Sequence, residues 1–334
     1  MMTAKIRSKI PLLLLVILLI LAVAMPAILN SDFLLSVLIE SGAMVLVALG
    51  FAAVFRSGQL SLGQAAFAAV GGYAGGILAA KFGFPFWAAL LAGGVAAAVV
   101  AFLLGVVVLR LGGLYFTIAT LALGEIAVII ASNWSQVTEG NIGIGVPMPV
   151  IQIGSMVIDF GADKSAFYYA ALLLIAVSAL ILWRIDNSRL GRIMKSVAVN
   201  PTLSEHSGMY LMKYRVIVFT IASFITGVGG AFYVHYFAWV GPSMFSSILS
   251  NGALMMCVIG GLWSLVWGPI IGAVIYTYLG TIMQLNLEGL RPMVFGAVVV
   301  LILIVMPNGL VDLPYKLPIW FKSIFKRKQA IPVK

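Results

Sequence analysis

The sequence predicts an all-α, polytopic membrane protein with about ten transmembrane helices and both termini in the cytoplasm. Three observations support this prediction. Of the 334 residues, 63% are hydrophobic and 9% are charged, which leaves too few polar groups to cover a soluble domain. Uncharged runs long enough to cross a bilayer recur along the whole chain. The basic residues also fall in segments that alternating helices would bring to one side of the membrane.

The expected spans follow one another with short breaks that hold charges, glycine or proline. The first covers about residues 10–29, and a cleavable signal peptide is the alternative for it. We favour a retained span, because the apolar run is longer than a usual signal-peptide core. The other expected spans are about residues 33–55, 62–80, 84–109, 112–131, 165–183, 216–239, 246–262, 269–285 and 292–306.

Charge sets the expected orientation of these spans. Of the 20 Lys and Arg residues, all fall on the expected inner side except Lys81, Lys164 and Arg291. The loop 184–215 and the tail 312–334 hold most of the rest, so both are expected in the cytoplasm. The segment 132–164 has more acids than bases and is expected outside. The basic tail suits the anionic lipids of the inner leaflet, so no nucleic-acid partner is implied.

A short helix is indicated inside the basic loop. Asn200 followed by Pro201 is typical of an N-cap with proline at the first helical position. Thr202 with Glu205 three residues later is an alternative N-terminus of the capping-box type. Gly208 is the expected end of the helix. A helix bounded this closely is expected to be rigid and to serve as a docking surface, although an ordinary loop with one helical turn is the alternative.

Polar residues within the expected spans are the other candidates, because ionisable groups at membrane depth are costly. Glu125 lies in TIATLALGEIAVII, where Thr117 and Thr120 are polar neighbours on the same helix. A hydrogen bond between helices is the structural alternative for this glutamate. His235 is expected in an interfacial aromatic belt, because aromatic residues flank it near the outer end of its span.

The segment 56–67, RSGQLSLGQAAF, opens a span with several polar residues that include Ser61 and Gln64. Protein or water must satisfy its hydrogen-bonding groups. An inner-face turn and a broken helix that lines a pathway are equally consistent with this pattern. Asn251, in a later span, is a further polar candidate.

Enzyme signatures are missing from the sequence. It contains no phosphate-binding loop that ends in Gly-Lys-Ser or Gly-Lys-Thr, and no cluster of His, Cys and acidic residues at metal-ligand spacing. We therefore expect a chain with no catalytic residues, no metal site and no cofactor of its own.

Three separated stretches resemble one family. They are RSGQLSLGQAAFAAVGGYAGG; LGGLYFTIATLALGEIAVIIASNWSQVTEGNIGIGVP; and GRIMKSVAVNPTLSEHSGMYLMKYRVIVFTIASFITGVGGAFYVHYF with VIGGLWSLVWGPIIGAVI. In order, and over most of the chain, these stretches are similar to LivM-type permease subunits of branched-chain amino acid ABC importers. The resemblance implies a bacterial inner-membrane protein, in one transmembrane domain over residues 1–334. It also implies a LivH-type partner permease, two ATP-binding subunits that use the ATP, and a periplasmic amino-acid-binding protein.

Under this resemblance the helix at 200–208 is a coupling helix that seats in an ATP-binding subunit. The residues expected to couple to that subunit are Arg192, Asn200, Pro201, Thr202, Glu205 and Gly208. The candidates for the translocation path are Ser61, Gln64, Thr117, Thr120, Glu125 and Asn251. Urea, short amides and aromatic amino acids are alternative substrates. An ion-coupled secondary transporter is the alternative class, disfavoured because few ionisable residues lie within the spans.

Overall fold

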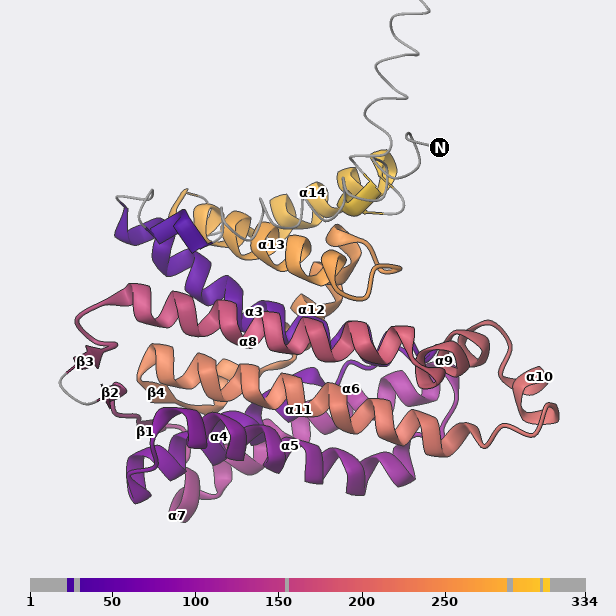
Figure 1. Ribbon diagram of the computed structural model, residues 1–334, viewed down its shortest axis with the longest axis horizontal. Coiled ribbons are helices and arrows are strands. Elements are labelled where there is room, and N and C mark those ends of the chain that lie inside the picture. The colour runs from indigo at the N-terminus through magenta and orange to yellow at the C-terminus, as the bar shows by residue number, and fades with distance from the viewer. Residues whose placement is uncertain (1–22, 27–30, 154–155, 287–290, 307–308, 313–334) are drawn as a thin grey trace, which may run out of the picture.

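The computed structural model describes residues 23–26, 31–153, 156–286, 291–306 and 309–312. The expected first span and the basic tail fall almost entirely outside the described residues. Most of the described chain is helical (Figure 1). The long helices are α3 (Asp32–Phe55), α4 (Gln64–Phe82), α5 (Phe86–Val108), α6 (Gly113–Asn133), α8 (Lys164–Asn187), α11 (Leu211–Phe237), α12 (Ser247–Gly260), α13 (Trp267–Asn286) and α14 (Arg291–Val305).

Shorter elements connect these helices. The short helices are α7 (Ser135–Thr138), α9 (Arg189–Val199), α10 (Pro201–His206) and the 3-10 turns η1 (Pro242–Phe245) and η2 (Leu310–Asp312). Two antiparallel strand pairs are present: β1 (Ile144–Gly145) with β4 (Trp239–Val240), and β2 (Val150–Ile153) with β3 (Met156–Asp159). The sequence analysis expected a polar segment here and did not predict strands.

Seven segments of the described chain are long and apolar enough to cross a membrane. They are α3, α4, α5, α6, α8, α11 and the run Pro242–Gly260 that η1 and α12 form. The prediction of a polytopic helical membrane protein is therefore confirmed. Helices α13 and α14 occupy the positions of the ninth and tenth expected spans. The total of ten spans and the side on which each terminus lies remain predictions.

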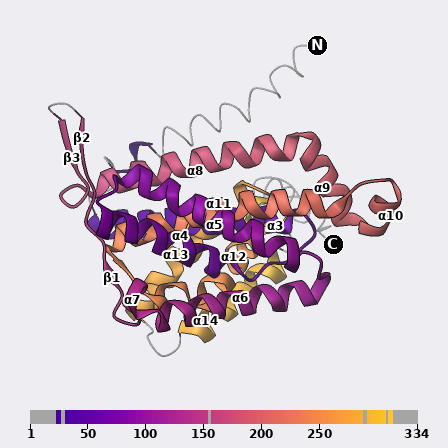
Figure 2. The ribbon, with the colours of Figure 1, turned by 90° about the horizontal axis from the view of Figure 1, so that it is seen from below.

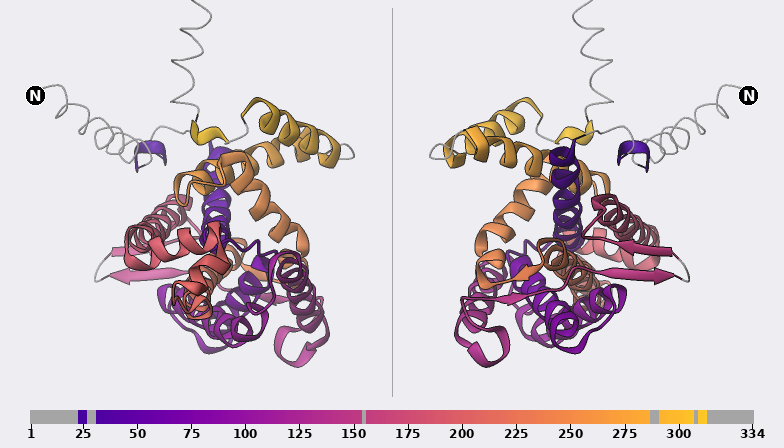
Figure 3. Two further views of the ribbon diagram at one scale, coloured as in Figure 1. Left: turned by 90° about the vertical axis from the view of Figure 1, so that its right-hand side faces the viewer. Right: turned by 90° about the vertical axis from the view of Figure 1, so that its left-hand side faces the viewer.

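Helix α11 lies at the centre of the bundle and packs against α3, α4 and α5. Helices α13 and α14 lie on the side of this core away from α4 and α5 (Figure 3). Glycines allow the close approach: Gly71 of α4 lies directly against Gly227 of α11, where any side chain would collide with the facing backbone. The GGYAGG pattern therefore marks the contact of α4 with the central helix.

The expected inner and outer segments lie at opposite ends of the bundle (Figures 1 and 2). One end, here called the α10 end, carries α9, α10 and the loop between α12 and α13. The other, the strand end, carries α7 and both strand pairs. There β1 pairs with β4, and the indole Nε1 of Trp239 donates to the carbonyl oxygen of Ile142 at 3.1 Å. The chain thus separates its basic loop from its acidic segment along the length of the helices.

The basic loop holds more regular structure than the sequence analysis expected. Helix α8 continues to Asn187, and Ser188 caps the unpredicted helix α9 by accepting a hydrogen bond from the backbone nitrogen of Leu190 at 3.2 Å. Helix α9 is amphipathic, since Gly191, Met194 and Val197 are buried at helical spacing. The spacing of these three residues is present in the sequence, but the basic residues between them led us to expect a loop instead of a helix.

His235 lies near the strand end of α11, as expected, but the prediction that it belongs to an aromatic belt facing the membrane interface is wrong. Its side chain is buried, with 1% exposed, and its ring centroid lies 5.3 Å from that of Phe86. The Nδ1 atom lies 2.8 Å from the carbonyl oxygen of Ala231, one turn earlier in α11. The aromatic residues near His235 come together across helices, a packing that sequence proximity alone did not indicate.

Candidate functional site

The short helix α10 begins at Pro201, and Asn200 is its N-cap. The side-chain oxygen Oδ1 of Asn200 accepts a hydrogen bond from the backbone nitrogen of Leu203 at 3.0 Å. Proline at the first helical position leaves no amide hydrogen unpaired there. Of the two N-termini that the sequence left open, the structure therefore selects Asn200 and places Thr202 inside the helix, exposed.

The other end of α10 is closed by a Schellman motif. The backbone nitrogen of Gly208 donates to the backbone carbonyl oxygen of Glu205 at 2.9 Å. The backbone nitrogen of Met209 donates to the backbone carbonyl oxygen of Ser204 at 3.3 Å. Gly208 has a φ of +78°, a left-handed conformation that a residue with a side chain adopts only at a cost. Both ends of this six-residue helix are thus fixed by local hydrogen bonds.

The tip of the molecule around α10 exposes large apolar side chains. The exposed fractions are 87% for Val199, 65% for Leu203 and 72% for Tyr210. The predicted coupling residues Arg192 and Glu205 are also exposed. Exposed apolar groups beside charged ones, at the end of the bundle, are typical of a protein-binding surface. These three apolar residues were not among the predicted ones, although apolar residues inside a charged loop were a usable signal in the sequence.

Between α3 and α4 lies a non-helical segment, residues 57–63, here called the polar break. It begins in the turn at residues 56–58 and continues over residues 59–63 without regular secondary structure. Ser57, Gln59 and Ser61 are buried, with exposed fractions of 2%, 4% and 1%, as is Gln64 at the start of α4. Helix α4 begins only at Gln64, so residues 59–63 enter the bundle as non-helical chain. The polar break is enclosed by protein, as expected for unwound backbone at membrane depth.

Helix α6 satisfies the backbone of the polar break. The Thr117 hydroxyl donates to the carbonyl oxygen of Leu60 at 2.8 Å, and the backbone nitrogen of Leu62 donates to the Thr120 hydroxyl at 3.0 Å. Thr120 lies seven residues after Gly113, the first residue of α6, which corresponds to about 10 Å along the helix axis. The polar break therefore penetrates well beyond the α10 end of the bundle.

The start of α4 is bonded to two further helices. The hydroxyl of Thr226, near the middle of α11, donates to the side-chain oxygen Oε1 of Gln64 at 2.7 Å. The backbone nitrogen of Ala65 donates to the hydroxyl of Ser250 in α12 at 2.9 Å. Thr226 and Ser250 were not among the predicted residues; polar residues in apolar runs were their only signal in the sequence.

Four of the six path candidates thus come together where α4, α6 and α11 meet: Ser61, Gln64, Thr117 and Thr120. The other two, Glu125 on α6 and Asn251 on α12, lie on the exposed surface of the chain. Their helices pack against one another. A glutamate on the surface of an apolar helix needs a partner protein or water, because lipid cannot solvate it.

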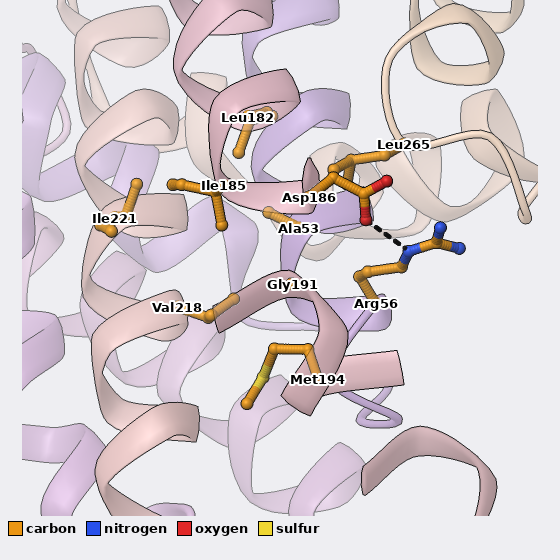
Figure 4. A pocket seen from close by; sticks show the side chains of 10 residues that line it. All are labelled: Ala53, Arg56, Leu182, Ile185, Asp186, Gly191, Met194, Val218, Ile221 and Leu265. Atoms are coloured by element: carbon orange, nitrogen blue, oxygen red, sulfur yellow. Dashed lines mark hydrogen bonds and ion pairs between the residues drawn. The ribbon is translucent and has the colours of Figure 1, made fainter. Parts of the chain in front are cut away.

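An ion-pair cluster at the α10 end was missed by the sequence analysis. Asp186, in the last turn of α8, accepts from Arg56 Nε at 3.1 Å and from Lys195 Nζ at 2.9 Å. The Arg56–Asp186 pair lies at the rim of a small pocket (Figure 4). The apolar residues of this pocket come from several helices and the α12–α13 loop: Ala53, Leu182, Ile185, Met194, Val218, Ile221 and Leu265.

Among the described residues, no group of three or more His, Cys, Asp and Glu side chains lies close enough to hold a metal ion. The single cysteine, Cys257, is buried in α12. A helical bundle with a short helix capped at both ends at one end and a buried polar break within its spans has the features of a membrane transport subunit.

Comparison with known proteins identifies the family. Residues 33–306 match the family described as branched-chain amino acid transport system / permease component, and the chain belongs to this family. It is 29% identical over 321 residues to the high-affinity branched-chain amino acid transport system permease protein LivM of Escherichia coli K12. That alignment covers 90% of this chain and 74% of the relative. LivM of Salmonella typhimurium LT2 is likewise 29% identical, over 318 residues.

The family and these relatives confirm the resemblance to LivM-type permeases. The protein is accordingly a multi-pass membrane transport subunit and not a catalytic enzyme.

Proposed function

We propose that this chain is one permease subunit of an ATP-driven importer of branched-chain or related neutral amino acids in a bacterial inner membrane. Its partners would be a LivH-type permease, two ATP-binding subunits that hold and hydrolyse the ATP, and a periplasmic binding protein that delivers substrate. Membership of the permease family and similarity to the two LivM proteins support this assignment.

Helix α10 is the observation that carries the proposal. It is closed at both ends, exposes Leu203 and Glu205 on its surface, and follows α9 after a single residue, Asn200. A rigid projection of this kind transmits force instead of absorbing it by unfolding. Closure of the ATP-binding subunits on their nucleotide would push on α10 and rock the helices, which opens the substrate path alternately to the two sides.

The proposed path runs along the surface that α6 and α12 present to the partner permease. Glu125 and Asn251 are exposed there and are available to contact substrate or water. Ser61, Gln64, Thr117 and Thr120 stand behind this surface, where they anchor the polar break. A small amino acid without net charge needs few ionisable groups along its path, which agrees with the composition of the spans.

The substrate within this class is proposed from the relatives, whose names specify branched-chain amino acids. Urea, short amides and aromatic amino acids are the alternative cargoes. A binding assay with the cognate binding protein, followed by uptake of each bound compound, separates them. Uptake by this chain alone, driven by an ion gradient and indifferent to ATP, would instead indicate the secondary-transporter class.

The decisive experiment reconstitutes the chain with its proposed partners in proteoliposomes and measures ATP hydrolysis and leucine uptake together. We expect binding protein with leucine to stimulate both activities. Gly208→Ala should reduce uptake for each ATP hydrolysed, because it strains the C-terminus of α10. Gly83→Ala is the matched control. Gly83 also ends a helix with positive φ (+64°), in open space like Gly208, but lies at the strand end.

Glu205→Ala provides a second variant, which removes an exposed charge without straining the backbone. We expect it to weaken the response of ATP hydrolysis to substrate. If both Gly208→Ala and Glu205→Ala matched wild type in uptake and hydrolysis, α10 would not be the coupling element.

A further inference from the structure

The ion-pair cluster of Arg56, Asp186 and Lys195 joins four elements at the α10 end. Asp186 belongs to α8 and accepts from Arg56, the C-cap of α3, and from Lys195 of α9. The Arg56 guanidinium also donates from Nη1 to the carbonyl oxygen of Trp263, in the loop between α12 and α13, at 3.2 Å. Asp186 is 20% exposed, so protein partly shields its two ion pairs from solvent.

A second contact lies beside this cluster. Gly58, in the polar break, has a φ of +77° and packs against Ala198 of α9. A Cβ atom on Gly58 would lie 2.8 Å from the Cα atom of Ala198, closer than side-chain carbons approach. Helix α9 therefore holds the turn after α3 at two points, through Lys195 and Asp186 on Arg56 and through Ala198 on Gly58.

Both points lie between α10 and the interior of the bundle. On one side, α9 leads through Asn200 directly into α10. On the other, the turn leads through the polar break to hydrogen bonds with Thr117, Thr120 and Thr226. A displacement of α10 that carries α9 with it must either move this turn or break the ion pairs and the backbone contact.

We propose that the Arg56–Asp186–Lys195 cluster, with the Gly58–Ala198 contact, is the linkage that transmits the movement of α10 to the polar break. Asp186 is its positioning residue: it touches no substrate, and its two ion pairs hold α9 against the turn after α3. The linkage rests on the proposed function, since it needs a partner that moves α10.

Charge is the property of Asp186 that the linkage requires. Asp186→Asn keeps the shape of the side chain but removes the attraction for both cations. Lys195→Gln separates α9 from the cluster while it leaves the Arg56–Asp186 pair in place. Asp186→Glu and Lys195→Arg keep the charges and serve as conservative rescues.

The test measures leucine uptake and ATP hydrolysis in proteoliposomes that contain the full complex. We expect Asp186→Asn and Lys195→Gln to hydrolyse ATP in response to substrate, but to import roughly 5- to 150-fold less leucine per ATP, the range by which coupled sites typically change one another's binding affinity. A defect in folding would lower both activities together and leave their ratio unchanged. Asp32→Asn is the control, because it makes the same substitution at an exposed position at the far end of α3.

The outcomes separate the linkage from the proposed function. If the wild-type complex neither imports leucine nor responds to it, the proposed function is wrong and the linkage falls with it. If the wild-type complex imports leucine and Lys195→Gln keeps the wild-type ratio, the linkage alone is overturned. If the Asp186→Asn variant does not assemble, the Lys195→Gln variant alone tests the linkage. This variant keeps the Arg56–Asp186 pair that joins α3 and α8, so it is expected to assemble. Restoration of the ratio by Lys195→Arg supports the linkage.

Discussion

Thr226 donates a 2.7 Å hydrogen bond to the side-chain oxygen of Gln64 in the middle of the bundle. The two residues are 162 positions apart, and their exposed fractions are 0% and 1%. In this setting a donor that is removed is not replaced by water. Among the described residues, the Thr226 hydroxyl is thus the donor to the side-chain oxygen of Gln64, the first residue of α4.

Thr226→Val should destabilise the protein by about 1–3 kcal/mol, because the substitution leaves the buried oxygen of Gln64 without its donor. The difference in the free energy of unfolding is measured by unfolding both purified proteins in detergent with heat or denaturant. Thr220→Val is the matched control: Thr220 lies in the same helix, and its hydroxyl donates to Val216 of that helix. Equal losses for the two variants would contradict a special role of the bond to Gln64.

Gln59→Met should leave the protein as stable as wild type or stabilise it by about 1 kcal/mol. Gln59 is buried, and neither atom of its amide has a hydrogen-bond partner among the described residues. Methionine has a similar shape and no polar group to desolvate. The same unfolding measurement applies, with Gln64→Met as the contrasting variant that should destabilise. A loss of stability in Gln59→Met would show that the amide is paired, for example with water.

Asn200→Ala should loosen α10 without unfolding the bundle. Loss of the N-cap hydrogen bond to Leu203 costs about 0.5–2 kcal/mol locally. Hydrogen exchange of the backbone amides of residues 202–208 should therefore become faster by roughly tenfold, while exchange in α11 stays unchanged. Asn200→Asp keeps the capping oxygen and should exchange like wild type. Unchanged exchange in Asn200→Ala would mean that Pro201 and the Schellman motif suffice to hold the helix.

Leu203→Ser should weaken binding of an ATP-binding subunit by about tenfold or more, since loss of an apolar anchor at an interface costs about 1–2 kcal/mol or more. The side chain is 65% exposed, so the fold of the permease should not change. Binding of the purified subunit to the permease in lipid nanodiscs measures the effect. Val150→Ser, at a 54% exposed position of the strand end, is the control. Equal affinity for Leu203→Ser and wild type would remove Leu203 from the docking surface.

The sequence by itself determined the features that depend on neighbouring residues. Long apolar runs specify membrane helices, because each span must satisfy its own backbone in lipid. Asn200, Pro201 and Gly208 specify the ends of α10, because caps act over a few residues. The GGYAGG pattern indicated close helix packing for the same reason, although it did not say against which helix.

Only the tertiary structure decided which distant residues meet. Arg56 and Asp186 are 130 positions apart, and no periodicity or motif pairs them. The sequence also left open whether the polar break was a turn at the surface or a segment inside the bundle. Burial of the break against α6 decided this question. Such contacts depend on how all the helices pack, and the same polar residue is costly or stabilising according to the partner that packing brings to it.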